Sequence, residues 1–212
     1  MIITISRQYA AGGSEVARRV AGALGWSLVD NQLIDEVAVR AGLSREEVAE
    51  REERAPGFIE RLARALAASA PEFVAPETGT VPELTEEDLL RITEKVVAEL
   101  TAVGNVVVVG RAAPAVLAQR ADALHVKIVA PRADRIARAM ARRGLDAKQA
   151  EKMLHDTDAN RGRYHKQYYG RDWDDPVNYD LMLNTGRLGI EGAMEVIVAR
   201  ATPLRPSASS PA

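Results

Sequence analysis

The chain has 212 residues, of which 47% are hydrophobic and 27% are charged, and this is enough for one globular domain of ordinary size. Its 28 Lys and Arg residues nearly balance its 30 Asp and Glu residues, so the composition excludes a polybasic protein that wraps nucleic acid or coats a membrane. Because the chain has no cysteine, it also has no disulfide framework, thiolate zinc site or cysteine nucleophile. Neither a signal-peptide core nor a membrane-length apolar stretch is present, so we expect a soluble, cytoplasmic protein.

The first thirty residues predict a strand, a tight loop, a helix and a second strand. Residues 1–6 are rich in β-branched side chains and run into the Gly-containing turn at residues 10–13. Apolar residues then recur at helical spacing over 14–24, and 26–29 form a short strand that ends at Asp30. Units of this kind build parallel sheets.

The middle of the chain predicts helices on either side of an irregular stretch. Residues 31–70 have a helical pattern, residues 70–85 are interrupted by Pro and Gly, and a helix should span residues 85–103. The valine run at 105–109 is typical of a strand that is buried on both faces of a parallel sheet.

The last third predicts two more strands and three helices, followed by a disordered tail. The strands are expected at 125–130 and 179–183, and the helices at 132–143, from a cap at Asp146 toward Tyr169, and at 189–199; the tail is 203–212. The complete pattern predicts a three-layer α/β/α fold with a parallel sheet of about five strands.

The segment from Ile5 to Ala17 has the layout of an anion site, because the amides of a helix N-terminus point into the loop before it. Against the phosphate-loop pattern G-x-x-x-x-G-K-[ST], Gly12 and Ser14 fit, whereas Arg7 and Gly13 replace the first Gly and the Lys. A plain strand-to-helix turn is the alternative interpretation. Since no lysine precedes Lys95, an arginine would have to supply the missing charge; Arg7 is the nearest candidate and Arg111 the next.

Four segments of the chain carry motifs that are found together in one family. They are ITISRQYAAGGSEVA (3–17), WSLVDNQLI (26–34), VVVVGRAAPAVL (106–117) and NRGRYHKQYYGRDWDDPVNYDLMLNTGRLGIE (160–191). The fourth is the most specific, with its Arg-rich stretch followed by tyrosines and W-x-D-P-x-N-Y-D-L. In these segments the chain resembles the cytidylate kinase-like family, whose members are relatives of the nucleoside-monophosphate kinases within the P-loop NTPases. In this family a Gly-Gly pair often stands in place of Gly-Lys.

The resemblance implies one kinase-like domain over residues 1–202 that binds ATP and Mg²⁺. Its core would comprise 1–30, 104–145 and 178–202, with a helical acceptor lobe at 31–103 and a lid at 146–177. The residues implied to bind ATP are Arg7, Ala11, Gly12, Gly13, Ser14 and Glu15 at the phosphates, with the Ser14 hydroxyl on Mg²⁺, and Thr185, Gly186 and Arg187 in a loop at the adenine ring.

The implied catalytic residues are mostly arginines, which suits phosphoryl transfer because guanidinium groups bind phosphate oxygens in pairs. Asp30 would lie near the acceptor phosphate, Arg111 would bind the acceptor monophosphate, and Arg161 and Arg163 would close over the transferring group. Simpler interpretations remain for each: a helix cap for Asp30, an ion pair for Arg111, and a solvated helix face for Arg161 and Arg163.

The sequence therefore predicts ATP-dependent phosphoryl transfer to a small acceptor, such as CMP or dCMP, with no nucleic-acid or membrane partner. One departure puts a cytidine-phosphate acceptor in question. Cytidylate kinases follow their second strand with D-x-G-x-x-Y-R, whose arginine binds the monophosphate, whereas this chain ends the same stretch with Asp35-Glu36, so Glu36 stands at the position of that arginine. A kinase of another small hydroxyl compound, and a nucleotide-binding protein without turnover, are the alternatives. The sequence leaves the oligomeric state open.

Overall fold

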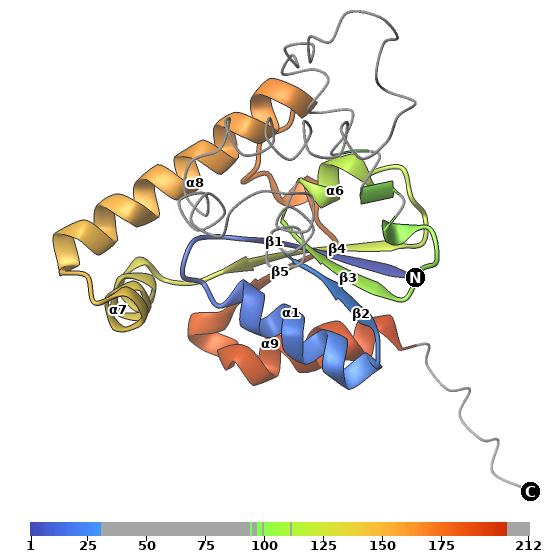
Figure 1. Ribbon diagram of the computed structural model, residues 1–212, viewed down its shortest axis with the longest axis horizontal. Helices are drawn as coiled ribbons and strands as arrows, with labels where there is room; N and C mark the ends of the chain where they lie inside the picture. The colour runs from blue at the N-terminus through green and yellow to red at the C-terminus, as the bar shows by residue number, and fades with distance from the viewer. Residues whose placement is uncertain (31–93, 95–96, 99, 111, 203–212) are drawn as a thin grey trace, which may run out of the picture.

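A computed structural model shows a five-stranded parallel sheet with helices on both faces, which confirms the predicted α/β fold class (Figure 1). It describes residues 1–30, 94, 97–98, 100–110 and 112–202. The strand order is β2-β3-β1-β4-β5, and every pairing is parallel. The strands are β1 (Ile2–Arg7), β2 (Ser27–Val29), β3 (Val106–Val109), β4 (Ala123–Val129) and β5 (Leu181–Asn184).

The strand predictions hold to within two residues at each end. All four valines of β3 are buried, as expected for a strand covered on both faces. The last strand begins at Leu181 instead of at residue 179, because Pro176–Asn178 form a 3₁₀ turn (η2) that the Asp175 side chain caps by accepting from the Val177 amide.

Three helices match their predicted bounds closely: α1 (Gly13–Leu24), α7 (Arg132–Arg143) and α8 (Ala147–Tyr169). The predicted cap of α8 is present as a capping box, in which the Asp146 side chain accepts from the Gln149 amide and the Gln149 side chain accepts from the Asp146 amide.

Two helical features differ from the predictions. The last helix, α9 (Thr185–Ala201), begins four residues before the predicted start at Gly189, because Asn184 caps it and Gly189, with φ of 68°, only kinks it. The one-turn helix α6 (Ala113–Val116) was not predicted, since four residues carry no helical period.

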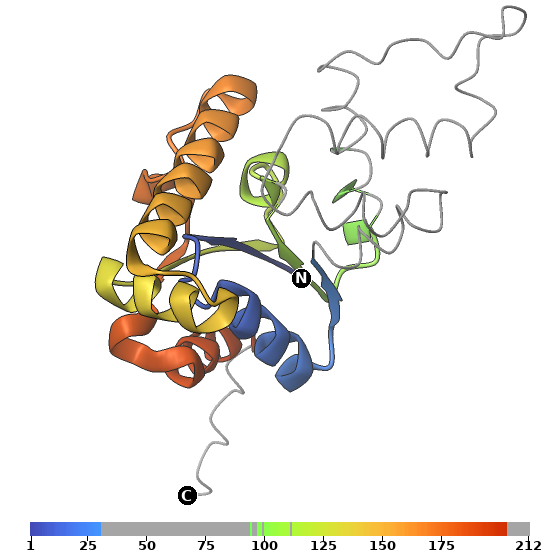
Figure 2. The same cartoon turned by 60° about the vertical axis from the view of Figure 1, so that its left-hand side comes forward.

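The two faces of the sheet are covered by different helices. Helices α1 and α9 cover one face, where Ile3 and Ile5 of β1 and Val126 and Ile128 of β4 form an apolar core with them. Helix α6 lies on the other face, while α7 and α8 pack together beside the start of α1 (Figure 2). The carboxyl end of β1 meets a pocket that residues of α1, α7 and α8 line.

The predictions for the helices at 31–70, the irregular stretch at 70–85, most of the helix at 85–103 and the tail at 203–212 lie outside the described residues. Among the residues that are described, no helix combines the length and the apolar character needed to cross a membrane.

Candidate active site

The loop between β1 and α1 has the geometry of an anion site. Gly12 adopts the left-handed conformation with φ of 86°, and its carbonyl accepts from the amides of Glu15 and Val16 at the start of α1. The amides of Gly12, Gly13 and Ser14 have no hydrogen-bond acceptor among the described residues, and all three residues line one pocket. These donors and the positive end of the α1 dipole suit a phosphate group.

Gly13 is required by a close contact with the stem of Arg7, and Gly12 is required by its left-handed backbone conformation. A Cβ on Gly13 would lie 2.6 Å from Cβ of Arg7, and a Cβ on Gly12 would lie 2.4 Å from Cδ1 of Ile190 on α9. Because the stem of Arg7 fills the space where a side chain at position 13 would begin, the loop cannot hold the usual lysine there.

The pocket has a volume of about 300 Å³ and is strongly basic. Five arginines line it, against a single carboxylate among the described lining residues, Asp30. The sequence predicted Arg7, Arg161 and Asp30 here but missed three of the arginines. The lining arginines are Arg7, Arg18, Arg142, Arg143 and Arg161.

The three arginines that the sequence did not predict, Arg18, Arg142 and Arg143, are brought to the pocket by the packing of the helices. Arg142 and Arg143 end α7, which the sequence marked as arginine-rich, but only the packing of α7 beside the loop brings them to the phosphate site. Arg18 lies one turn into α1 and forms an ion pair with Glu15. Helical spacing from Ser14 could have placed Arg18 on the loop side of α1.

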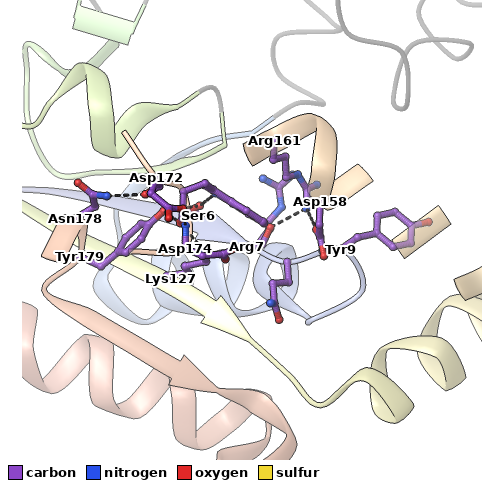
Figure 3. A network of polar contacts seen from close by, with 12 residues as sticks. Ser6, Arg7, Tyr9, Lys127, Asp158, Arg161, Asp172, Asp174, Asn178 and Tyr179 are labelled. Carbon is purple, nitrogen blue, oxygen red and sulfur yellow. Dashed lines mark hydrogen bonds and ion pairs between the residues drawn. The ribbon is translucent and has the colours of Figure 1, made fainter. Parts of the chain in front are cut away.

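Arg161 is tied to the phosphate loop by a polar network (Figure 3). Its Nη1 donates to the carbonyl oxygen of Arg7 at 2.7 Å and lies 3.3 Å from Oδ1 of Asp158. The same Oδ1 accepts from the Tyr9 amide at 2.8 Å. Burial lowers the pKa of Arg161 while Asp158 opposes the change, and the guanidinium remains a cation near neutral pH.

Asp158 also joins α7 to this network. Arg135 of α7 forms an ion pair with Asp158, and its Nε donates to the Tyr9 carbonyl at 2.8 Å. Asp158 therefore connects the loop, α7 and α8. The sequence predicted no role for Asp158, since nothing in its spacing indicates that it contacts Tyr9.

Three other residues that were predicted to bind ATP or to act in catalysis, Arg163, Ala11 and Glu15, are not among the described residues that line the pocket. Arg163 is exposed and bonds to Asn160, outside the described lining of the pocket. Ala11 is fully buried, and its carbonyl accepts from the Thr185 hydroxyl at 2.6 Å. The Glu15 carboxylate pairs with Arg18 and Arg19, and its hydrogen bond from Arg19 is the main cause of a lowered pKa.

The segment Thr185-Gly186-Arg187 is not the loop that was predicted. It forms the first turn of α9, because the Asn184 side chain accepts from the Gly186 amide and caps the helix. Thr185 is buried beside Arg138, whose Nη1 donates to its hydroxyl at 3.0 Å, whereas Arg187 is exposed. The turn nevertheless lies next to the phosphate loop through the bond from Thr185 to Ala11.

Arg111, predicted to bind the acceptor monophosphate, lies outside the described residues, as do Asp35 and Glu36. Asp30, at the end of β2, lines the same pocket as Ser14. Within the described ranges, no cluster of three His, Cys, Asp or Glu side chains could hold a metal by itself. A hydroxyl and a carboxylate beside a polyphosphate still fit Mg²⁺, which takes most of its ligands from phosphate and water.

Comparisons with known proteins agree with this fold. The model of the cytidylate kinase-like family matches residues 2–187. An uncharacterized protein from Eubacterium ventriosum is 21% identical, with 95% of this chain and 98% of that chain covered and a TM-score of 0.64. Shikimate kinase from Bacteroides thetaiotaomicron is 14% identical, with 94% and 97% covered and a TM-score of 0.53. No curated protein matches the chain.

Proposed function

Since the chain belongs to the cytidylate kinase-like family, we propose that it transfers the γ-phosphoryl group of MgATP to a small acceptor, a nucleoside monophosphate such as CMP or dCMP. Family membership supports a kinase, and the acceptor is our proposal. The observation that carries the proposal is the set of five arginines around a phosphate-type loop. Phosphoryl transfer requires mainly positioning and cations around the transferring oxygens, and this pocket offers both.

Arg7 takes the part that lysine has in other phosphate loops. Its stem lies against Gly13, and its side chain lines the pocket, so a cation enters from the end of β1 instead of from α1. A guanidinium can bind two phosphate oxygens at once, which compensates for the lost ammonium.

The remaining arginines would bind the polyphosphate from the other sides. Arg18 approaches from α1, Arg142 and Arg143 from α7, and Arg161 from α8. Because Arg161 already contacts the Arg7 carbonyl, a bound phosphate would meet its guanidinium at the loop, where charge develops during transfer. Arg163 keeps its proposed lid role if closure of residues 146–177 turns it inward.

The Ser14 hydroxyl and the Asp30 carboxylate would hold Mg²⁺ together with phosphate oxygens. When bound, the ion neutralises charge on the phosphates. We propose that the adenine ring lies along the first turn of α9, near Gly186 and Arg187. Arg111 would bind the acceptor phosphate.

The test is ADP release by the full chain with MgATP and CMP, dCMP, UMP, AMP, GMP, shikimate or no acceptor. We expect release that depends on one nucleoside monophosphate. ADP release that occurs only with shikimate would show that the acceptor is a small hydroxyl compound and not a nucleoside monophosphate. ATP binding without release on any acceptor would support the second candidate, a nucleotide-binding protein without turnover, which the glycine at position 13 favours.

A further inference from the structure

A buried lysine lies under the connection between α8 and β5. Lys127 is in the middle of β4, on the same face of the sheet as Ser6 of β1, with which it is in register. Its side chain is 0% exposed. Lysine is almost never fully buried unless it is paired, so a residue kept for packing alone would be apolar here.

The ammonium of Lys127 contacts three groups of the segment from Gly170 to Asp180. It donates to the Trp173 carbonyl at 2.5 Å and to Oδ1 of Asp174 at 2.6 Å, and it lies 3.8 Å from the centre of the Trp173 ring. Tyr179 adds a hydroxyl that donates to the same Trp173 carbonyl at 2.8 Å. Burial lowers the pKa of Lys127, and the bond to Asp174 opposes that change.

Trp173 connects this lysine to the phosphate loop. Its indole Nε1 donates to Oγ of Ser6 at 2.8 Å, and the next residue, Arg7, accepts from Arg161 through its carbonyl. Two consecutive residues at the end of β1 are thus held by α8 and by the segment that follows it, as Figure 3 shows for Ser6, Arg7, Arg161 and Lys127.

We propose that Lys127 is a positioning residue, which anchors residues 170–180 to the sheet and thereby fixes the carboxyl half of α8, with Arg161 at the phosphate loop. The effect on turnover rests on the proposed function, because it acts through Arg161. The anchoring of residues 170–180 by Lys127 does not rest on the proposed function, so experiments can reject the anchoring and the function separately.

The experiment compares Lys127→Met with Lys152→Met, a lysine of α8 whose side chain is 77% exposed. Both are made with Trp26→Phe, so that Trp173 is the sole tryptophan. Three quantities are measured on each variant: acrylamide quenching of Trp173 fluorescence, Kd for MgATP, and kcat.

For Lys127→Met we expect a quenching constant raised about threefold or more, since Trp173 is 3% exposed in the parent. We also expect kcat to fall by about 10- to 100-fold while Kd for MgATP changes by less than about threefold. Lys152→Met should leave all three unchanged. A folded Lys127→Met protein with parental quenching and parental kcat would overturn the proposal.

The pH dependence gives a readout that loss of packing alone would not produce. In the parent, quenching should rise in one step as Lys127 loses its proton, below the usual lysine pKa of about 10.4. The charged and titratable groups that face Lys127 are Asp158, Arg171, Asp172, Asp174, His165 and Tyr179. Burial lowers the pKa of His165 to about 4 and raises the pKa of Tyr179 to about 12, so neither ring accounts for a step just below the usual lysine pKa. The step should be absent from Lys127→Met.

If Lys127→Met does not fold, Asp174→Asn tests the same point, because the Asp174 side chain is 69% exposed. Without this carboxylate the charged lysine is less favoured, so the midpoint of the quenching step should move to lower pH. An unchanged midpoint would overturn the proposal. If the parent binds MgATP but turns over no acceptor, the proposed function fails, and the quenching results still decide the anchoring.

Discussion

Position 13 is occupied by glycine because Arg7 fills the space beside it. The sequence showed that a lysine was missing and that Arg7 was the nearest cation, but it could not show that the two facts are one packing arrangement. That Arg7 stands in for the missing lysine can be recognised only when the end of β1 and the start of α1 are placed together. A similar limit applies to Arg142 and Arg143, which are far from the loop in sequence.

Gly13→Ala should weaken MgATP binding by about tenfold or more, because the new Cβ displaces Arg7 from the loop. The matched control is Gly22→Ala in the same helix, where a Cβ meets nothing within 4 Å. This control should leave affinity unchanged and slightly stabilise α1. Isothermal titration measures both, and equal affinities for the two variants would show that Arg7 is not held by Gly13.

The burial of His165 should make the stability of the protein depend on pH. It is 7% exposed among the rings of Tyr164, Tyr169 and Trp173, and burial lowers its pKa to about 4, assisted by the charge on Lys127. In the unfolded chain the His165 ring therefore binds a proton below about pH 6.5, whereas in the folded protein it binds one only below about pH 4. Stability that is complete above pH 6.5 is lost as the pH falls through this range.

We expect His165→Phe to remove roughly 3 kcal/mol of the fall in unfolding free energy between pH 7 and pH 4. Urea denaturation at several pH values measures the difference from the parent. His155→Gln, which changes a histidine with an 80% exposed side chain, is the control. A pH profile of His165→Phe parallel to that of the parent would contradict the assignment.

At the scale of the elements, the sequence predicted α8 and its capping box because Asp146 and Gln149 have the right spacing. It could not predict what α8 contacts. Asp158 joins this helix to the loop at Tyr9 and to Arg135 of α7, through bonds between residues more than twenty positions apart. The first turn of α9 was missed for a related reason, since its cap, Asn184, also ends a strand.

Asp158→Asn should lower the free energy of unfolding by about 3 kcal/mol, because it leaves the buried Arg135 without its counter-charge. Asp156→Asn, which removes an exposed ion pair with Lys152 on the same helix, should cost less than about 1 kcal/mol. Urea denaturation compares them. Equal losses would mean that Asp158 does not join the three elements.

At the scale of the whole molecule, the formal charge of −2 conceals a basic pocket. The composition argues against a polyanionic polymer as partner, yet the fold collects five arginines around one small cavity. The order of the strands does this, because it places β1 at the centre of the sheet and α7 and α8 beyond its carboxyl end. The fold class could be predicted from periodicity, whereas the composition of the pocket could not.

MgATP at about 100 times its Kd should stabilise the protein by about 2.7 kcal/mol, which corresponds to a rise in Tm of about 5 to 10 °C. The rise should shrink with added salt, since the contacts are between charges. Differential scanning fluorimetry at low and high NaCl measures it. An increase in Tm that is insensitive to salt would argue against binding through the arginines.

The central claim, that these arginines serve phosphoryl transfer, is tested most directly by Arg161→Ala. Measured beside Arg120→Ala, an exposed arginine paired with Asp122, it should lower kcat by about 100-fold or more while Kd for MgATP changes by less than about fivefold. Arg120→Ala should match the parent. If Arg161→Ala loses ATP affinity and keeps its kcat, Arg161 binds the ground state alone, and the account of its role in transfer is contradicted.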